Sequence, residues 1–213
     1  MKKFITNNQK GIVGTIFLIL FDSTLYLCSK LIQGPPNLLI SNIDNKIPFI
    51  SIFVYIYAIW YILLFLVPLI LYTKNKEKYY QYFVSSILAV IISNIIFIIY
   101  PTTVTRPTIP YNNITNYILN IIYQIDTPAI NCFPSLHCLI SFLFIYYINT
   151  SNINNKIKLT ITILSILVVL STILIKQHIL IDVISAFILS IIIFIIVAKT
   201  NIALKTKKII EKQ

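Results

Sequence analysis

The chain contains only two histidines, His137 and His178, and each lies beside polar residues that could make an imidazole catalytic. His137 closes the tetrapeptide Pro-Ser-Leu-His, which begins at Pro134, and Asp182 follows His178 by four positions. An imidazole changes its protonation state near neutral pH, so it can act as a nucleophile or pass a proton. The types and spacing of these residues predict nucleophilic or acid–base chemistry.

The pair of His178 and Asp182 has the spacing of neighbours on one helix face, since we expect a helix to begin at His178. The carboxylate could then accept the imidazole N–H, fix its tautomer and raise the nucleophilicity of the other nitrogen. His178 is therefore a candidate nucleophile. A His–Asp pair that only caps a helix explains the two residues equally well.

Residues suited to anion binding accompany the histidines. Arg106 is the single arginine of the chain, and a guanidinium holds phosphate or carboxylate through two parallel hydrogen bonds. Ser135 could cap a helix whose free N–H groups bind an anion, and His137 could protonate a leaving oxygen. A serine cap with an interfacial histidine is the alternative. Two histidines and a carboxylate could also hold a metal, but the anion-binding residues lead us to expect no metal and no cofactor.

Composition places these residues in a membrane protein. Of the 213 residues, 58% are hydrophobic and 11% are charged, and the mean hydropathy is +0.88. A soluble domain has roughly 25% charged residues. The net charge of +11 could suggest nucleic acid as a partner, but the cations lie almost entirely in short loops and tails, so we expect none.

The sequence supplies about six apolar runs, which predicts an all-α, polytopic membrane bundle of about six transmembrane helices. The fourth run looks short, so we expect its helix to extend beyond Ser135 and Ile148. The region between Pro107 and Phe133 reads only as a polar, Asn-rich loop. The expected spans are Ile12–Leu31, Pro48–Tyr72, Tyr79–Ile99, Ser135–Ile148, Ile157–Ile175 and His178–Ala198.

The cations are distributed unequally over the two sides that these spans define. Alternating the loops puts 13 of the 17 cations, including the tail lysines, on the side of both termini. The positive-inside rule makes this side cytoplasmic. The candidate residues named above then fall together at the extracytoplasmic face, where the remaining cations also lie: Lys30, Lys46, Arg106 and Lys176.

Other polar residues have two possible roles each. Cys132 and Cys138 could form a disulfide or lie buried as small apolar side chains. Asp22 lies inside the first span, where it is either functional or paired, for instance with Lys30. Asp126 could orient the arginine or simply end a turn.

In order and spacing, these residues resemble the type 2 phosphatidic acid phosphatase (PAP2) superfamily. The motifs are Arg-Pro at Arg106, Pro-Ser-x-His ending at His137, and Ser171 followed seven positions later by His178. They lie between residues 100 and 186, and the six-span layout extends the resemblance to one PAP2-like domain over residues 1–213. Residues 199–213 form its basic cytoplasmic tail, which we expect to favour anionic lipids.

The resemblance implies a role for each candidate residue. His178 attacks phosphorus to give a phosphohistidine, Asp182 orients it, and His137 protonates the leaving alkoxide. The residues that would bind the phosphoryl oxygens are Arg106, Ser135 and Ser171.

Two positions depart from the pattern of the family. Ile99 stands where a lysine is common, and Thr172 where an arginine is common, so two phosphate-binding cations are missing. Lys176 either replaces one of them or is an ordinary turn lysine.

The resemblance implies a lipid phosphatase or phosphotransferase whose substrate is a lipid phosphate. We expect the protein in a bacterial plasma membrane. The residues around His137, and the motif that contains Ser171 and His178, look closest to the inositol phosphorylceramide synthase-like branch. That branch transfers head groups to a lipid hydroxyl. The sequence leaves hydrolysis against transfer open, as well as the oligomeric state. The alternatives are a small transporter or lipid-binding protein, and a PAP2-like protein that has lost catalysis.

Overall fold

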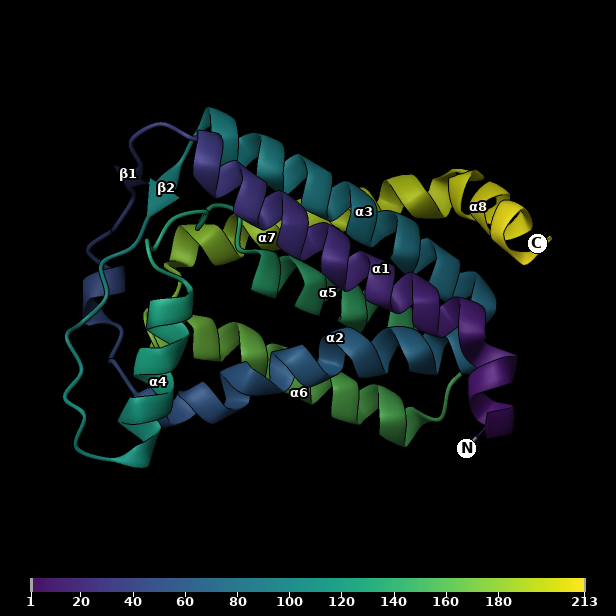
Figure 1. The fold of residues 1–213 in the computed structure, drawn as a ribbon, viewed down its shortest axis with the longest axis horizontal. Coiled ribbons are helices and arrows are strands. Elements are labelled where there is room, and N and C mark those ends of the chain that lie inside the picture. The colour runs from purple at the N-terminus through teal and green to yellow at the C-terminus, as the bar shows by residue number, and fades with distance from the viewer. Residues whose placement is uncertain (1, 213) are drawn as a thin grey trace.

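The computed structural model describes residues 2–212, with side chains from residue 6 onward. Helices dominate these residues and run along one another over most of the length of the molecule (Figure 1). Their bounds are α1 Lys2–Ile32, α2 Val54–Lys74, α3 Lys76–Ile99, α4 Ile114–Ile125, α5 Leu136–Asn149, α6 Asn155–Leu174, α7 Leu180–Lys199 and α8 Ile202–Glu211.

Five helices are long and apolar enough to cross a membrane: α1, α2, α3, α6 and α7. Together with the near absence of strand among the described residues, they confirm the predicted all-α membrane bundle. The predicted spans agree with these helices in order, although α1 begins well before Ile12 and α2 well after Pro48.

The fourth predicted span corresponds to α5, which has only 14 residues. The expected extension of this helix was therefore wrong. At about 1.5 Å per residue, such a helix is shorter than the roughly 30 Å hydrocarbon core of a bilayer. α5 packs against α3, α6 and α7, and it buries Leu139, Leu143 and Phe144 completely. A helix enclosed by other helices need not match the lipid thickness, which explains how a short run can occupy this place.

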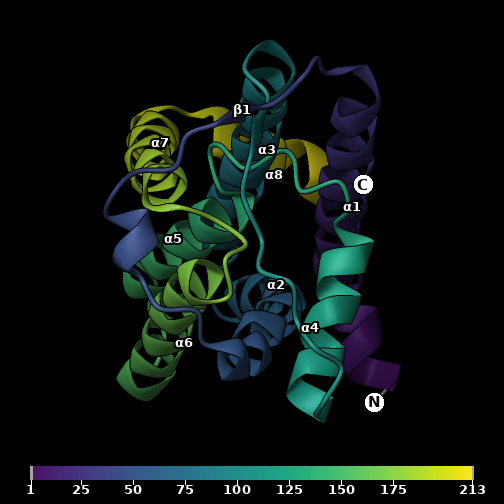
Figure 2. The same cartoon turned by 90° about the vertical axis from the view of Figure 1, so that its left-hand side faces the viewer.

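One end of the bundle is closed by loops and a small sheet. Strand β1 (Asn37–Leu38) pairs in parallel with β2 (Thr102–Thr103), and Thr103 bridges to Ile130. This end lies on the left in Figure 1 and faces the viewer in Figure 2. We call it the loop end; it includes two short 3-10 helices, Asp44–Lys46 and Ser51–Phe53.

Helix α4 lies at the loop end, where the sequence indicated only a polar loop. Its N-cap Asn113 accepts a hydrogen bond from the Asn116 N–H, and its apolar side faces α2, with Leu119 and Tyr123 in a cluster with Tyr57. Asparagines dominate the sequence around this helix, so its apolar face was not recognised.

The opposite end of the bundle carries the beginning of α1 and the basic C-terminal segment (Figure 1). That segment forms α8, which packs on α3. Glu211 makes an ion pair with Lys76 at 3.0 Å, and the Lys10 ammonium donates to the Ile210 carbonyl at 2.9 Å. The tail is therefore a docked helix.

The close packing of α1 depends on Gly11. A Cβ atom added there would lie 2.3 Å from the Cγ atom of Tyr72. The substitution Gly11→Ala gains about 1 kcal/mol of helix propensity, but overpacking costs about 1–3 kcal/mol, and such a close approach belongs at the upper end. We expect thermal unfolding in detergent to shift down by a few degrees.

Gly34 provides the matched control, since an added Cβ there would meet no atom within 4 Å. Gly34→Ala should leave the unfolding temperature unchanged. An equal shift in both variants would contradict the packing of α1 against Tyr72.

Candidate active site

A cavity of about 270 Å³ opens at the loop end, between α1, α2 and the loops that precede α5 and α7. His137 and His178 both line it, together with Trp60 of α2. A larger hollow of about 550 Å³ lies at the opposite end among α1, α3 and α8, and none of the predicted site residues lines it. The smaller cavity is therefore the candidate active site.

His178 and Asp182 are in contact, but not as two residues of one helix. Helix α7 begins at Leu180, so His178 precedes it, and the expectation of a helix beginning at His178 was wrong. The contact arises from helix capping instead. Asp182 Oδ2 accepts the Ile179 N–H at 3.1 Å and lies 3.3 Å from His178 Nδ1.

The backbone around His178 is fixed by the last turn of α6. The N–H groups of Gln177 and His178 both donate to the Thr172 carbonyl, at 2.9 and 3.1 Å. Asp182 is fully buried, and its Oδ1 atom has no hydrogen-bond partner among the described residues. Because Nδ1 of His178 faces the carboxylate, Nε2 is the nitrogen left for chemistry.

His137 is the second residue of α5, and α2 holds its ring. Its Nε2 atom lies 2.7 Å from the Tyr57 hydroxyl, and the Trp60 ring centroid is 4.2 Å from that of His137. The imidazole rings of His137 and His178 lie 5.7 Å apart. A small group in the cavity that both rings line could contact both.

The hydroxyls of both predicted phosphate-binding serines serve their own helices. Ser135 is the N-cap of α5 and accepts the Cys138 N–H at 3.3 Å, which is the predicted cap. Ser171 donates to the Val168 carbonyl at 2.6 Å. Both side chains are fully buried, and neither residue lines the cavity.

The guanidinium of Arg106 lies against the C-terminal end of α4. It donates to the carbonyls of Tyr123 and Asp126, to Asp126 Oδ2 at 2.5 Å and to Gln177 Oε1. Gln177 adjoins His178, so the arginine connects α4 with the segment of the candidate nucleophile. Arg106 itself does not line the cavity.

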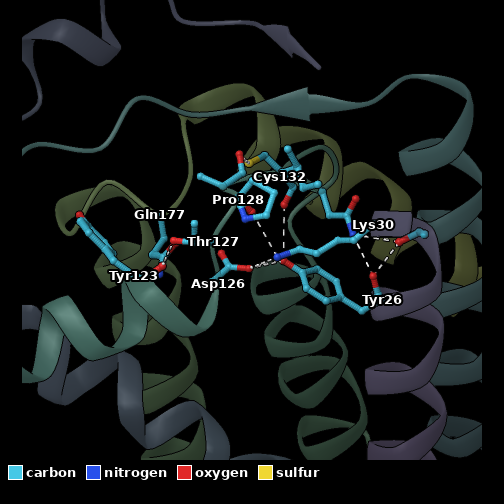
Figure 3. Close-up of polar contacts among 12 residues, drawn as sticks. Tyr26, Lys30, Tyr123, Asp126, Thr127, Pro128, Cys132 and Gln177 are labelled. Carbon is cyan, nitrogen blue, oxygen red and sulfur yellow. Dashed lines mark hydrogen bonds and ion pairs between the residues drawn. The ribbon is translucent and has the colours of Figure 1, made fainter. Parts of the chain in front are cut away.

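Asp126 joins two cations that are distant in the sequence, Arg106 and Lys30, and Figure 3 shows its contact with Lys30. Its Oδ2 atom pairs with Arg106, as one of the two sequence interpretations expected, and its Oδ1 atom accepts from Lys30 at 2.9 Å and from Tyr26 at 2.6 Å. Burial raises the pKa of Asp126, but the hydrogen bonds of Tyr26 and Lys30 and the charge of Arg106 outweigh it and hold that pKa below its usual value. Lys30 therefore pairs with Asp126 and not with Asp22.

Lys176 binds backbone oxygens and does not line the cavity. Its ammonium donates to the carbonyls of Asp44 and Ile47 at 3.1 and 2.7 Å. The Asp44 carboxylate caps the start of α7, since it accepts the Leu180 N–H at 2.8 Å. Burial raises the pKa of Asp44, but the hydrogen bonds from Leu180 N–H and Ser41 outweigh burial and hold that pKa below its usual value. Lys176 thus fixes the turn that precedes His178.

Cys132, His178 and Asp182 form the one group of potential metal ligands found in the described residues, with their ligand atoms within 4.8 Å. Burial raises the pKa of the Cys132 thiol, which opposes the thiolate that a metal needs. Cys132 and Cys138 are free and buried, as small apolar side chains would be.

Sequence reasoning did not assign Tyr57, Trp60, Gln177 or Lys30 to the site. Tyr57 and Trp60 are three positions apart on α2 and so share a face, but nothing in the sequence indicates which histidine they meet. Lys30 lies far from the motifs in sequence and joins them only through Asp126.

Comparison with known proteins adds one match. Residues 35–196 match a sequence model of the PAP2 superfamily. No curated protein and no solved structure matches the chain. The matched region includes all the predicted site residues and both cavity histidines. The chain therefore belongs to the PAP2 superfamily.

Proposed function

We propose that this protein is a membrane phosphatase or phosphotransferase that cleaves a lipid phosphate ester through a phosphohistidine on His178. The observation that carries the proposal is the pairing of two histidines in one cavity. Their rings are 5.7 Å apart, and only His178 is backed by a buried carboxylate, that of Asp182. Membership of the PAP2 superfamily supports a phosphatase-type reaction.

In the first half-reaction, Nε2 of His178 attacks phosphorus, and the bond from phosphorus to the alcohol oxygen breaks. His137 gives a proton to the departing alkoxide, so a neutral alcohol leaves. The imidazole of His178 becomes positively charged as the phosphorus–nitrogen bond forms. Asp182, which faces Nδ1 at 3.3 Å, stabilises that charge, as the carboxylate of a hydrolase triad does.

In the second half-reaction, water or a lipid hydroxyl gives a proton to His137 and attacks phosphorus. The phosphorus–nitrogen bond then breaks and returns an electron pair to His178. Both half-reactions need only these two imidazoles and a means of holding the phosphoryl oxygens. The likeness to the inositol phosphorylceramide synthase-like branch favours a lipid hydroxyl as acceptor.

We propose Arg106, Ser135 and Ser171 for phosphate binding, as the resemblance implies, although none of the three lines the cavity. The guanidinium already holds carboxylate and amide oxygens, of Asp126 and Gln177. Phosphate oxygens would have to replace one of these acceptors. Lys176 is a weaker candidate, because its ammonium is bound to two backbone carbonyls.

We place the site at the extracytoplasmic face of a bacterial plasma membrane, with both termini in the cytoplasm. The distribution of cations supports this orientation, since 13 of 17 lie on the side of the termini. The basic residues of α8 would then face anionic lipids of the inner leaflet.

The proposal predicts that His178→Ala abolishes turnover, with a loss of about 10³-fold or more, because no other group can form the intermediate. Protein purified in detergent would be quenched during turnover of a phosphorus-labelled substrate. We expect an acid-labile, base-stable label on the wild type and none on the variant.

The control for that experiment is Lys46→Ala, which changes an exposed lysine at the loop end. This variant should keep the label and the activity. Full activity of His178→Ala would remove the proposed nucleophile.

A second prediction concerns His137 as the proton donor. His137→Ala should slow formation of the phosphohistidine from an alkyl phosphate by about 10²-fold or more, and its formation from 4-nitrophenyl phosphate far less, because nitrophenolate leaves without a proton. The label on His178 should also persist longer, since the second half-reaction needs His137 as base. Equal losses on the two substrates would refute this role.

A third prediction concerns the acceptor and the metal. Phosphatidate, undecaprenyl pyrophosphate and phosphatidylglycerol phosphate would be assayed with and without a lipid alcohol. We expect turnover of at least one substrate to continue in EDTA, because the imidazoles of His137 and His178 carry out the chemistry.

The products identify the acceptor. Phosphorylated lipid alcohol among the products would identify a transferase, and inorganic phosphate alone would identify a phosphatase. Loss of activity in EDTA would favour a metal at Cys132, and no turnover at all would favour a transporter, a lipid-binding protein or lost catalysis.

A further inference from the structure

Lys30 is the one lysine or arginine among the residues that line the cavity in the part of the chain that the structure describes. It stands near the end of α1, outside the region that matches the superfamily. Arg106 lies behind the cavity wall and does not line it. The one lysine or arginine of the described cavity lining therefore comes from α1.

Two protein oxygens and one aromatic ring surround the ammonium of Lys30 (Figure 3). It donates to Asp126 Oδ1 at 2.9 Å and to the Pro128 carbonyl at 3.2 Å, and it lies 4.9 Å from the Tyr26 ring centroid. An ammonium has three N–H donors. The described residues engage two of them, which leaves one for a ligand in the cavity.

Lys30 also supplies the net positive charge around Asp126 that would attract an anion. Arg106 and Asp126 form a pair without net charge, at 2.5 Å. Lys30 shares the same carboxylate and gives the group one net positive charge. The cavity wall carries a further carboxyl group, that of Asp22, which would repel a phosphate whenever it is ionised. Without Lys30, the charged side chains of the lining would be acidic apart from the histidines.

Burial makes this cation effective. The Lys30 side chain is only 11% exposed, and a charge-assisted hydrogen bond in such surroundings is stronger than one in water. Its position is also fixed, since Asp126 is bonded to Tyr26 of the same helix at 2.6 Å. A cation that is already in position can stabilise the charge that develops during phosphoryl transfer without a rearrangement of the protein.

We infer that Lys30 binds the phosphoryl oxygens of the substrate in the cavity and holds them between His137 and His178. This inference rests on the proposed function and deepens it by naming the phosphate-binding group on α1. Asp126 acts as a positioning residue: it aims Lys30 on one side and Arg106 on the other.

The test uses full-length protein in detergent with inorganic phosphate as the probe. We expect Lys30→Met to weaken inhibition by inorganic phosphate about ten-fold or more, the scale of one charge-assisted hydrogen bond. The KM for the lipid phosphate should rise by a similar factor. Lys30→Arg should keep most of the affinity, because it restores the cation, and Lys46→Met, in an exposed residue of the same end, should behave as wild type.

A double variant separates phosphate binding from a purely structural ion pair. If Lys30 only neutralises Asp126, then Lys30→Met combined with Asp126→Asn should recover both thermal stability and phosphate inhibition. We expect recovery of stability alone. Unchanged KM and unchanged phosphate inhibition in Lys30→Met would overturn the inference while leaving the proposed function intact.

The proposed function can fail separately in the same experiment. Wild-type protein that neither turns over a lipid phosphate nor gains thermal stability from inorganic phosphate would overturn both claims. A Lys30→Met protein that keeps its phosphate-induced stabilisation would overturn the role of Lys30 alone, whatever its activity.

Discussion

The candidate active site depends on the hydrogen bonds of one buried carboxylate, that of Asp182. An ionised carboxylate among apolar helices is costly unless it is paired. Asp182 is fully buried, and its Oδ2 atom accepts from the Ile179 N–H and faces His178 Nδ1. The same oxygen therefore caps α7 and orients the imidazole. Removing it would loosen the start of a spanning helix as well as the proposed nucleophile.

A second carboxylate, that of the half-buried Asp126, pairs with the cations of the site. It ends α4, and its two oxygens reach Lys30 of α1 and Arg106 of the loop after β2. Arg106 in turn holds Gln177, the neighbour of His178. Through these contacts, segments that are separated by about half of the chain share one charge network. The low pKa of Asp126 follows from that network, so the carboxylate stays ionised at neutral pH.

The sequence predicted the elements whose signals are local. Long apolar runs indicated the spans, Pro134 and Ser135 indicated the start of α5, and the spacing of His178 and Asp182 indicated their contact. The expected cause of that contact was wrong, because a capping turn and a helix face can share the same spacing. Helix length was also misjudged for α5, since the sequence does not show that other helices enclose it.

The contacts between distant segments could not be predicted in the same way. No periodicity relates Tyr57 to His137 or Lys30 to Asp126, because each contact is set by how helices pack. The asparagines around α4 hid its apolar face. Superfamily resemblance named the residues of the motifs, but α1 lies outside the matched region and its contribution appears only in three dimensions.

The central claim is that phosphorus is carried on His178 between two displacements, and the stereochemistry at phosphorus tests it most directly. Each in-line displacement inverts the configuration, so a reaction through a phosphohistidine must return the original one. A substrate with a chiral, isotopically labelled phosphoryl group would be reacted with an alcohol acceptor, and the product configuration determined. We predict net retention. Net inversion would show a single direct displacement and would contradict the account.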